Sequence, residues 1–174
     1  MIKALSQDLR NKIAAGEVVE GPSSIVKELI ENSLDAGSSE ILIVVEKGGQ
    51  GLIQVRDNGK GIPPEELSLS ILRFHTSKIN SVEDLFSIET LGFRGEALSS
   101  ISSVSEMSII SSCGNNDGAE LKMLKGNPGS IRPAASINGT EITIRNLFYN
   151  TPARRKFLKT PRTELRKVVD VVRR

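Results

Sequence analysis

The chain has 174 residues, of which 38% are hydrophobic and 25% charged, a length and composition that predict one globular domain and exclude a disordered tail. A single cysteine, Cys113, and a single histidine, His75, exclude a disulfide framework and a metal cluster of histidine and cysteine ligands. The net charge of +2 divides into −5 for residues 1–150 and +7 for residues 151–174, which predicts an acidic body followed by a basic segment.

The first predicted element is a helix over about residues 24–36. A proline and two serines start it, apolar residues recur at near-helical spacing, and Gly37 ends it. On this helix Glu28, Asn32 and Asp35 form a polar stripe beside the apolar face. Such a stripe is typical of an ordinary amphipathic helix, and it equally suits a carboxylate and an amide that point at a ligand inside the fold. The helix alone leaves both interpretations open.

A β-branched run over residues 41–45 and an alternation of apolar and polar residues over residues 52–56 flank a glycine-rich turn and predict a β-hairpin. The second run leads directly into Asp57, which is followed by Gly59 and Gly61. A carboxylate at a strand end can accept a hydrogen bond from a ligand, and glycines let the backbone approach it. An ordinary turn that contains aspartate and glycine is the alternative.

The remaining elements alternate helices with strands. A helix is predicted from Pro63 to Phe74, a short one after Ser81, and a third over residues 97–104 after a glycine-bracketed loop. From Thr163 a helical pattern is still running when the sequence stops, so we expect the sequence to be the front part of a longer protein. The predicted class is α/β or α+β, with helices on a mixed sheet. Strands are expected at residues 107–112, 119–125 and 141–147, and loops at residues 113–118 and 127–129.

The chain contains neither a P-loop nor a G-x-G-x-x-G fingerprint, but five of its segments, in order, resemble the nucleotide-binding motifs of the GHKL ATPases. They are Glu28 to Gly37, Asp57 to Gly61, Thr76-Ser77-Lys78, Gly92 to Leu98 and Gly139-Thr140. Three segments resemble the MutL family of DNA mismatch repair proteins in particular, namely Ile13 to Val19, Gly92 to Leu98 and Asn150 to Arg155. The resemblance covers essentially the whole chain.

The resemblance implies a two-layer GHKL-type ATPase fold, with a mixed β-sheet and helices packed on one face. It places a GHKL ATP-binding domain in residues 1–150. Residues 151–174 would be a basic segment and a truncated helix that lead toward an absent transducer subdomain.

Roles for single residues also follow from the resemblance. Glu28 would be the general base that deprotonates the attacking water, and Asn32 would be the protein ligand of Mg²⁺ that bridges the phosphates of ATP. Asp57 would accept a hydrogen bond from the adenine amino group, supported by Thr140, and the two glycines after Asp57 would let the backbone pass the base. These roles suit phosphoryl transfer to water, which needs positioning and charge neutralisation.

The phosphates would be held by Lys78, beside Thr76 and Ser77, and by an ATP lid through its backbone N–H groups and Arg94. The lid residues are Gly92, Phe93, Arg94, Gly95, Glu96, Ala97 and Leu98. The chain departs from the family pattern at Gly21, where an arginine is usual before the helix, and at His75, which lies one position later than usual. We assign His75 no catalytic role.

The basic segment has two interpretations. Its side chains could follow DNA phosphates without reading bases, with an affinity that falls steeply with salt, or they could be a solvated face that meets the rest of a longer protein. The residues concerned are Arg154, Arg155, Lys156, Lys159 and Arg162.

The resemblance implies an ATPase whose turnover is weak or absent in this chain alone, acting in an ATP-gated, dimeric DNA clamp. Its expected partners are non-specific DNA, a mismatch-recognition protein of the MutS type, and a MutL-like chain in a homodimer or heterodimer. No apolar run reaches the roughly 18 residues of a membrane span, so we expect an intracellular protein, in the cytoplasm of a bacterium or the nucleus of a eukaryote. The alternatives are another GHKL ATPase, such as a type II topoisomerase subunit or a chaperone, and a nucleotide-switched interaction module that does not hydrolyse ATP.

Overall fold

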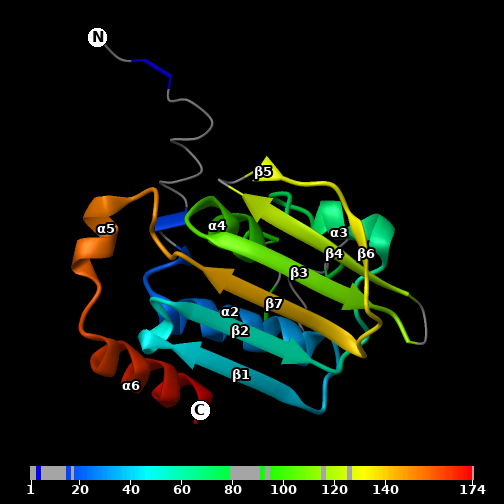
Figure 1. Ribbon diagram of the computed structural model, residues 1–174, viewed down its shortest axis with the longest axis horizontal. Coiled ribbons are helices and arrows are strands. Elements are labelled where there is room, and N and C mark those ends of the chain that lie inside the picture. Colours follow the sequence, from blue (N-terminus) through cyan, green and yellow to red (C-terminus); the bar gives the residue numbers. More distant parts are fainter. Residues whose placement is uncertain are drawn as a thin grey trace.

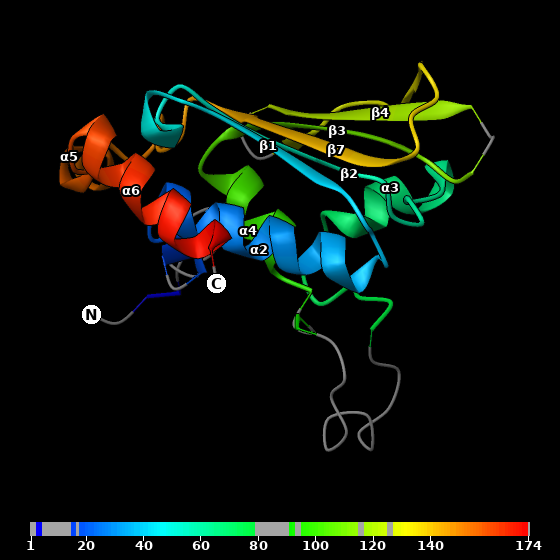
Figure 2. The same ribbon diagram turned by 90° about the horizontal axis from the view of Figure 1, so that it is seen from below.

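A computed structural model describes residues 3–4, 15–16, 18–78, 91–92, 95–114, 117–124 and 127–173 of the chain. The helices are α2 (Pro22–Asp35), α3 (Pro64–Ser70), α4 (Ala97–Ser103), α5 (Pro152–Phe157) and α6 (Pro161–Val172), with a short 3₁₀ turn η1 (Lys47–Gly49). The strands are β1 (Ile41–Glu46), β2 (Leu52–Asp57), β3 (Glu106–Ser112), β4 (Gly118–Leu124), β5 (Asn127–Pro128), β6 (Arg132–Ala134) and β7 (Gly139–Arg145). The strands form one layer, and α2, α3 and α4 lie on one face of it (Figure 1, Figure 2). The expected two-layer α+β fold is therefore confirmed.

The sheet departs from expectation in the direction of its strands. Its order is β1-β2-β7-β3-β4-β5, with β6 also paired to β4, and each pairing among the described residues is antiparallel. The predicted mixed sheet was wrong because β7, from late in the chain, inserts between β2 and β3. Those two strands point the same way but never pair, so the crossover through α3 and α4 creates no parallel ladder.

Helix α2 begins and is buried as its sequence predicts. Ser24 accepts hydrogen bonds from the backbone N–H groups of Glu20 and Gly21, at 3.0 and 3.2 Å, and thereby holds the chain at the helix start. Ile25 and Leu29 are fully buried against the sheet, where they meet core residues such as Ile53 of β2. Burial of this apolar face fixes the rotation of α2 about its axis, and with it the direction in which the polar stripe points.

The helix predicted from Pro63 to Phe74 is shorter in the structure. Helix α3 ends at Ser70, Ile71 is its C-cap, and Phe74 is 75% exposed with a φ of 61°. The expected place of Phe74 on the buried face was wrong, because the chain turns there and the Phe74 N–H donates to the carbonyl of Gly95 at 3.1 Å. The short helix predicted after Ser81 lies outside the described residues.

Three short elements escaped prediction. Asn127–Pro128 pairs with β4 as β5 rather than forming only a loop, and Arg132–Ala134 pairs with β4 as β6. Both are edge pieces of two or three residues that contain a proline, too short for an apolar period to appear. Helix α5, Pro152–Phe157, has no buried residue, so it also lacks an apolar stripe.

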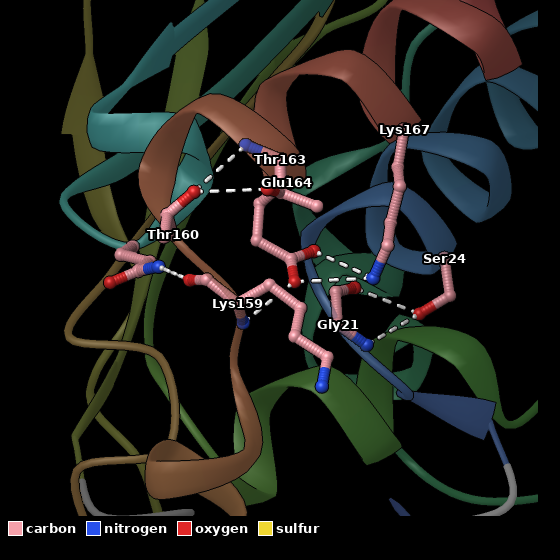
Figure 3. A network of polar contacts seen from close by, with 8 residues as sticks. Gly21, Ser24, Lys159, Thr160, Thr163, Glu164 and Lys167 are labelled. Carbon is pink, nitrogen blue, oxygen red and sulfur yellow. Dashed lines mark hydrogen bonds and ion pairs between the residues drawn. The ribbon is translucent and has the colours of Figure 1, made fainter.

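Helix α6 packs on α2 and on η1 (Figure 2). Figure 3 shows the polar contacts within this segment: Glu164 is 2% exposed, accepts a hydrogen bond from the Lys159 N–H at 3.0 Å, and pairs with the Lys167 ammonium at 3.2 Å. Gln50, directly after η1, donates to the Lys159 carbonyl at 2.8 Å. The basic segment therefore rests on the body of the domain, and the boundary expected at residue 150 stays a prediction.

Candidate functional site

A buried carboxylate closes the end of strand β2. Asp57 is 8% exposed, and its two oxygens accept hydrogen bonds from the Gly59 N–H at 2.9 Å, the Thr140 N–H at 3.3 Å and the Ser33 hydroxyl at 2.9 Å. Three donors therefore fix the orientation of the Asp57 carboxylate. The structure thus brings Asp57 and Thr140 together, as the motifs imply.

Strand β7 supports the same corner through a second buried pair. The hydroxyls of Thr140 and Ser111 lie 2.8 Å apart, and Ser111 also accepts a hydrogen bond from the Ile62 N–H at 2.8 Å. Ser111 and Thr140 are directly opposite each other in the β3–β7 ladder. The insertion of β7 is therefore what brings Thr140 to Asp57, from 83 residues further along the chain.

The two glycines after Asp57 have packing reasons of their own. A Cβ at Gly59 would lie 2.8 Å from Cβ of Ala36 at the end of α2. Gly61 has a φ of +72°, and a Cβ there would collide with the carbonyl of Ser112. Each position therefore admits only glycine, with or without a ligand.

The candidate catalytic residues lie one turn apart on α2. Glu28 and Asn32 are both half-buried, at positions i and i+4 of the helix. Ser33, the residue after Asn32, is the one that contacts Asp57. Helix α2 thus connects the corner at Asp57 with the polar stripe predicted from the sequence.

Lys78 joins that stripe from the segment after α3. Its ammonium lies 2.9 Å from Oδ1 of Asn32 and 2.5 Å from Oδ2 of Asp35. The Asp35 carboxylate also accepts the backbone N–H groups of Leu91 at 3.1 Å and Gly92 at 3.2 Å. Two segments from further along the chain, one with Lys78 and one with Leu91 and Gly92, therefore converge on Asp35.

The other expected lid and phosphate residues lie after α3 and at the start of α4. The Thr76 hydroxyl accepts the Lys78 N–H at 3.1 Å, and Ser77 is exposed beside it. Gly95 packs against the backbone of His75 and has a φ of +62°. Glu96 is the N-cap of α4, and Ala97 and Leu98 form its first turn. Phe93 and Arg94 lie outside the described residues.

The pKa of Asp35 is lowered from its ordinary value of 3.8. Burial, the largest single influence, raises the pKa, but the hydrogen bonds from Lys78, Leu91 and Gly92 and the charge of Lys78 together outweigh it. Because the folded-state pKa lies below the unfolded one, ionised Asp35 stabilises the fold above pH 3.8, and this contribution is lost as the pH falls through the folded-state value.

We therefore expect Asp35→Asn to lower the free energy of unfolding at pH 7 by about 2 kcal/mol, because it removes the charged acceptor of the Lys78 ammonium and of two backbone N–H groups. The side chain of Asp35 is only 8% exposed, so solvent screens this effect little. Urea denaturation at several pH values measures it. The difference between the two proteins should shrink as the pH falls below the ordinary aspartate range, and a difference that stays constant with pH would contradict the assignment.

The basic residues divide into one inward and several outward side chains. Arg154 donates a hydrogen bond to the carbonyl of Val19 and lies over the Phe148 ring, 4.3 Å from its centroid, and burial lowers its pKa. Phe148 is itself 1% exposed. The others point to solvent and are Arg155, Lys156, Lys159 and Arg162.

This placement predicts different effects for neighbouring arginines. Arg154→Ala should lower the free energy of unfolding by about 1–2 kcal/mol through loss of the hydrogen bond and the cation–π contact. Arg155→Ala is the matched control and should change it by less than about 0.5 kcal/mol. Equal losses in urea denaturation would mean that Arg154 does not anchor α5.

Ser33, Asp35 and Ser111 are the site residues that sequence reasoning gave no role. The sequence could have singled out Ser33, because it is a polar residue on the apolar side of α2, one turn after Leu29. Asp35 was on the predicted stripe, but its partners come from segments far along the chain. Nothing in the sequence around Ser111 singles it out from its serine neighbours.

The described parts of the chain offer neither a cluster of metal-binding side chains nor a helix that could span a membrane. No group of three or more histidine, cysteine, aspartate or glutamate side chains is placed there to hold a metal ion. None of the described helices is both long enough and apolar enough to cross a membrane.

The comparisons with known proteins agree with the motifs. Residues 20–126 match the family described as histidine kinase-, DNA gyrase B- and HSP90-like ATPase. The chain is 54% identical over 175 residues to a DNA mismatch repair protein MutL of Haemophilus influenzae, an alignment that covers 99% of this chain and 28% of that protein. It is 51% identical over 174 residues to the MutL of Halothermothrix orenii, over 99% of this chain and 27% of that protein. The chain thus spans little more than a quarter of these relatives.

Solved structures give the same picture. The Aquifex aeolicus MutL ATPase domain complexed with ADP is similar with a TM-score of 0.68 and 37% identity, covering 89% of this chain and 54% of that one. The N-terminal domain of a DNA repair protein is similar with a TM-score of 0.77 and 30% identity, covering 93% of this chain and 46% of that one. The resemblance read from the motifs is confirmed by these MutL relatives, and the chain belongs to the histidine kinase-, DNA gyrase B- and HSP90-like ATPase family.

Proposed function

We propose that this chain binds Mg-ATP and hydrolyses it slowly, as the ATPase part of a MutL-like mismatch repair protein in which ATP drives dimerisation of a DNA clamp. One observation supports this most. Helix α2 reaches both halves of the proposed site through adjacent residues, since Ser33 contacts Asp57 and Asn32 contacts Lys78. A nucleotide needs such a pairing, with a polar acceptor for its base and cations for its phosphates.

The adenine end of the site follows from hydrogen-bond capacity. A carboxylate has about four lone-pair sites, and Gly59, Thr140 and Ser33 occupy three of those of Asp57. The remaining lone pair would accept the adenine amino group. Because Asp57 is held by three donors, it would not need to reorganise when the base arrives.

The phosphate end suits a divalent cation that comes with its nucleotide. The Asn32 amide oxygen already accepts a cationic group, and an amide oxygen is a normal Mg²⁺ ligand. Since no cluster of metal-binding side chains is found among the described residues, water and the nucleotide's own phosphates would complete the coordination. When bound, Mg²⁺ would offset the negative charge of the phosphates.

The chain's own groups would perform the hydrolysis. Glu28, one turn before Asn32, would orient a water molecule and accept its proton. Lys78 and the lid residues, including Phe93 and Arg94, would hold the phosphates. The reaction needs positioning and charge neutralisation rather than a covalent intermediate.

A comparison of two proteins tests this assignment. The 174 residues should bind Mg-ADP but turn over Mg-ATP slowly or not at all, whereas a protein extended beyond Arg174 should turn it over faster. The missing contribution would come from a further subdomain that contacts the γ-phosphate. Full activity of the 174 residues alone, or no binding of Mg-ADP, would contradict the proposal.

Contact with DNA is proposed for the outward basic residues. Replacing both Arg155 and Lys156 with glutamate should weaken binding to non-specific DNA and reduce the slope of log affinity against log salt by about 2, one for each lost phosphate contact. Fluorescence anisotropy of a labelled duplex at several salt concentrations measures this. The control replaces Lys27 and Lys60, two exposed lysines elsewhere on the surface, with glutamate. It changes the net charge by the same amount but should weaken DNA binding less.

The remaining proposals concern the whole protein. We propose that it pairs with a second MutL-like chain, meets a mismatch-recognition protein of the MutS type, and works in the compartment that contains the DNA. Cross-linking in the presence of a non-hydrolysable ATP analogue tests the pairing, which should appear with the analogue and not with ADP.

A further inference from the structure

The ammonium of Lys78 lies where two oxygens of α2 converge. Oδ1 of Asn32 is 2.9 Å and Oδ2 of Asp35 is 2.5 Å from Nζ. The side chains of Lys78 and Asp35 are 18% and 8% exposed, so this cation is largely withdrawn from water. Gly92 closes the same place from the other side, because a Cβ there would lie 3.3 Å from Nζ and 3.9 Å from Oδ1 of Asn32.

Asn32 has one amide oxygen to offer to a cation. The same oxygen that accepts Lys78 is the one proposed to ligate Mg²⁺. A divalent cation on Oδ1 would lie within a few ångströms of the ammonium, and like charges repel strongly where little water separates them. This repulsion opposes binding of the divalent cation at Asn32 for as long as Lys78 keeps its place.

We propose that Lys78 holds the metal position at Asn32 in the nucleotide-free protein, so that a divalent cation is admitted only together with the phosphates that draw Lys78 away. This inference rests on the proposed role of Asn32 as a metal ligand. The phosphates supply what the metal alone lacks, a new anionic partner for the ammonium. Lys78 thereby acts first as a substitute cation and then as a phosphate contact.

Asp35 is a positioning residue in this scheme. Its carboxylate retains the N–H groups of Leu91 and Gly92 and so keeps an anion at this place whether or not Lys78 is present. Once Lys78 leaves, Asp35 and Asn32 present two oxygens toward one point. Removing the lysine side chain should therefore expose a weak metal site that the wild-type chain conceals.

The test measures Mn²⁺ alone, without nucleotide, by the decrease of the free-ion signal in electron paramagnetic resonance. Wild-type protein should show no tight site, and Lys78→Met should bind Mn²⁺ at least tenfold more tightly. Lys78→Arg retains the cation and should behave as wild type. Adding Asn32→Ala to Lys78→Met should abolish the gain.

A matched control separates this effect from a general loss of positive charge. Lys27 is on the same helix, pairs with Glu31 at 3.3 Å and is 57% exposed, so Lys27→Met should leave Mn²⁺ affinity unchanged. Affinity of Lys78→Met within twofold of wild type would overturn the proposal, as would an equal gain in Lys27→Met.

A measurement on wild-type protein covers the case in which Lys78→Met fails to fold. With its lysines ¹³C-dimethylated, the Lys78 resonance should shift on addition of Mg-ADP and stay in place with Mg²⁺ alone. A shift with Mg²⁺ alone would overturn the inference.

Failure of the proposed role of Asn32 as a metal ligand would give different results from failure of the inference about Lys78. If the affinity of wild-type protein for ADP does not depend on Mg²⁺, or if Asn32→Ala does not change that dependence, then the assignment of Asn32 is wrong. If both dependences hold and Lys78→Met still gains no Mn²⁺ binding, only the inference about Lys78 is wrong.

Discussion

Glu28→Gln is expected to lower the rate of ATP hydrolysis by about 100- to 10,000-fold, the usual contribution of a general base. The amide retains the shape of the side chain but cannot accept the proton of the attacking water. Binding of ADP should be unchanged, since Glu28 is proposed to contact water and not the nucleotide. Turnover is measured on protein extended beyond Arg174, and binding by calorimetry on the 174 residues.

Glu31→Gln is the matched control for this prediction. Glu31 is a carboxylate on the same helix, three residues further along, and pairs with Lys27. Its replacement should leave turnover unchanged. If Glu28→Gln retains wild-type turnover, Glu28 is not the base, and a nucleotide-switched module that does not hydrolyse ATP becomes the better description.

Asp57→Asn is expected to reduce ATP affinity by about 30- to 150-fold, the equivalent of a hydrogen bond to a charged group worth about 2–3 kcal/mol. It should also change the base preference. Inosine triphosphate has a 6-oxo group in place of the amino group, so wild-type protein should discriminate against it. An asparagine amide at this position can donate to that oxygen, and the discrimination should disappear or reverse.

Ser33→Ala separates the recognition of the base from the stability of the fold. It removes one of the three donors to Asp57 and should lower the free energy of unfolding by about 1 kcal/mol. The preference for ATP over inosine triphosphate should remain, because the carboxylate stays. If Asp57→Asn lowers the affinities for ATP and inosine triphosphate by the same factor, Asp57 supports the fold and does not read the base.

Local features of the sequence were sufficient to predict the elements that hold these residues. The apolar spacing of α2 and its polar stripe are properties of one segment, and so is the hairpin that ends at Asp57. Residues within one helix or hairpin meet whatever the rest of the chain does. Helix α2, strands β1 and β2 and their polar ends could therefore be predicted before the structure.

Contacts between distant segments could not be predicted in this way. Strand β7 pairs with β2 and β3, which lie far from it in the sequence. No local periodicity in the sequence indicates this pairing. Thr140 reaches Asp57 only through this insertion. The motif resemblance paired these two residues, whereas the residues alone did not.

The contacts of Lys78 within the site could not be predicted from the motifs. The motifs associate it with the phosphates, but they do not say where its ammonium lies before a nucleotide is present. Its contacts with Asn32 and Asp35 depend on how two later segments, around Lys78 and around Leu91 and Gly92, pack against α2. The basic segment shows the same limit, since a run of charges does not reveal that Arg154 points inward.

Assigned amide and side-chain NMR spectra with and without Mg-ADP test the central claim most directly. The largest shifts should fall on Gly59 and Thr140 around the base and on Asn32, Lys78 and Gly92 around the phosphates, with the outer residues of α5 and α6 unchanged. Shifts that gather away from α2 and the β2–β7 corner, or no shifts at saturating Mg-ADP, would contradict the proposed site.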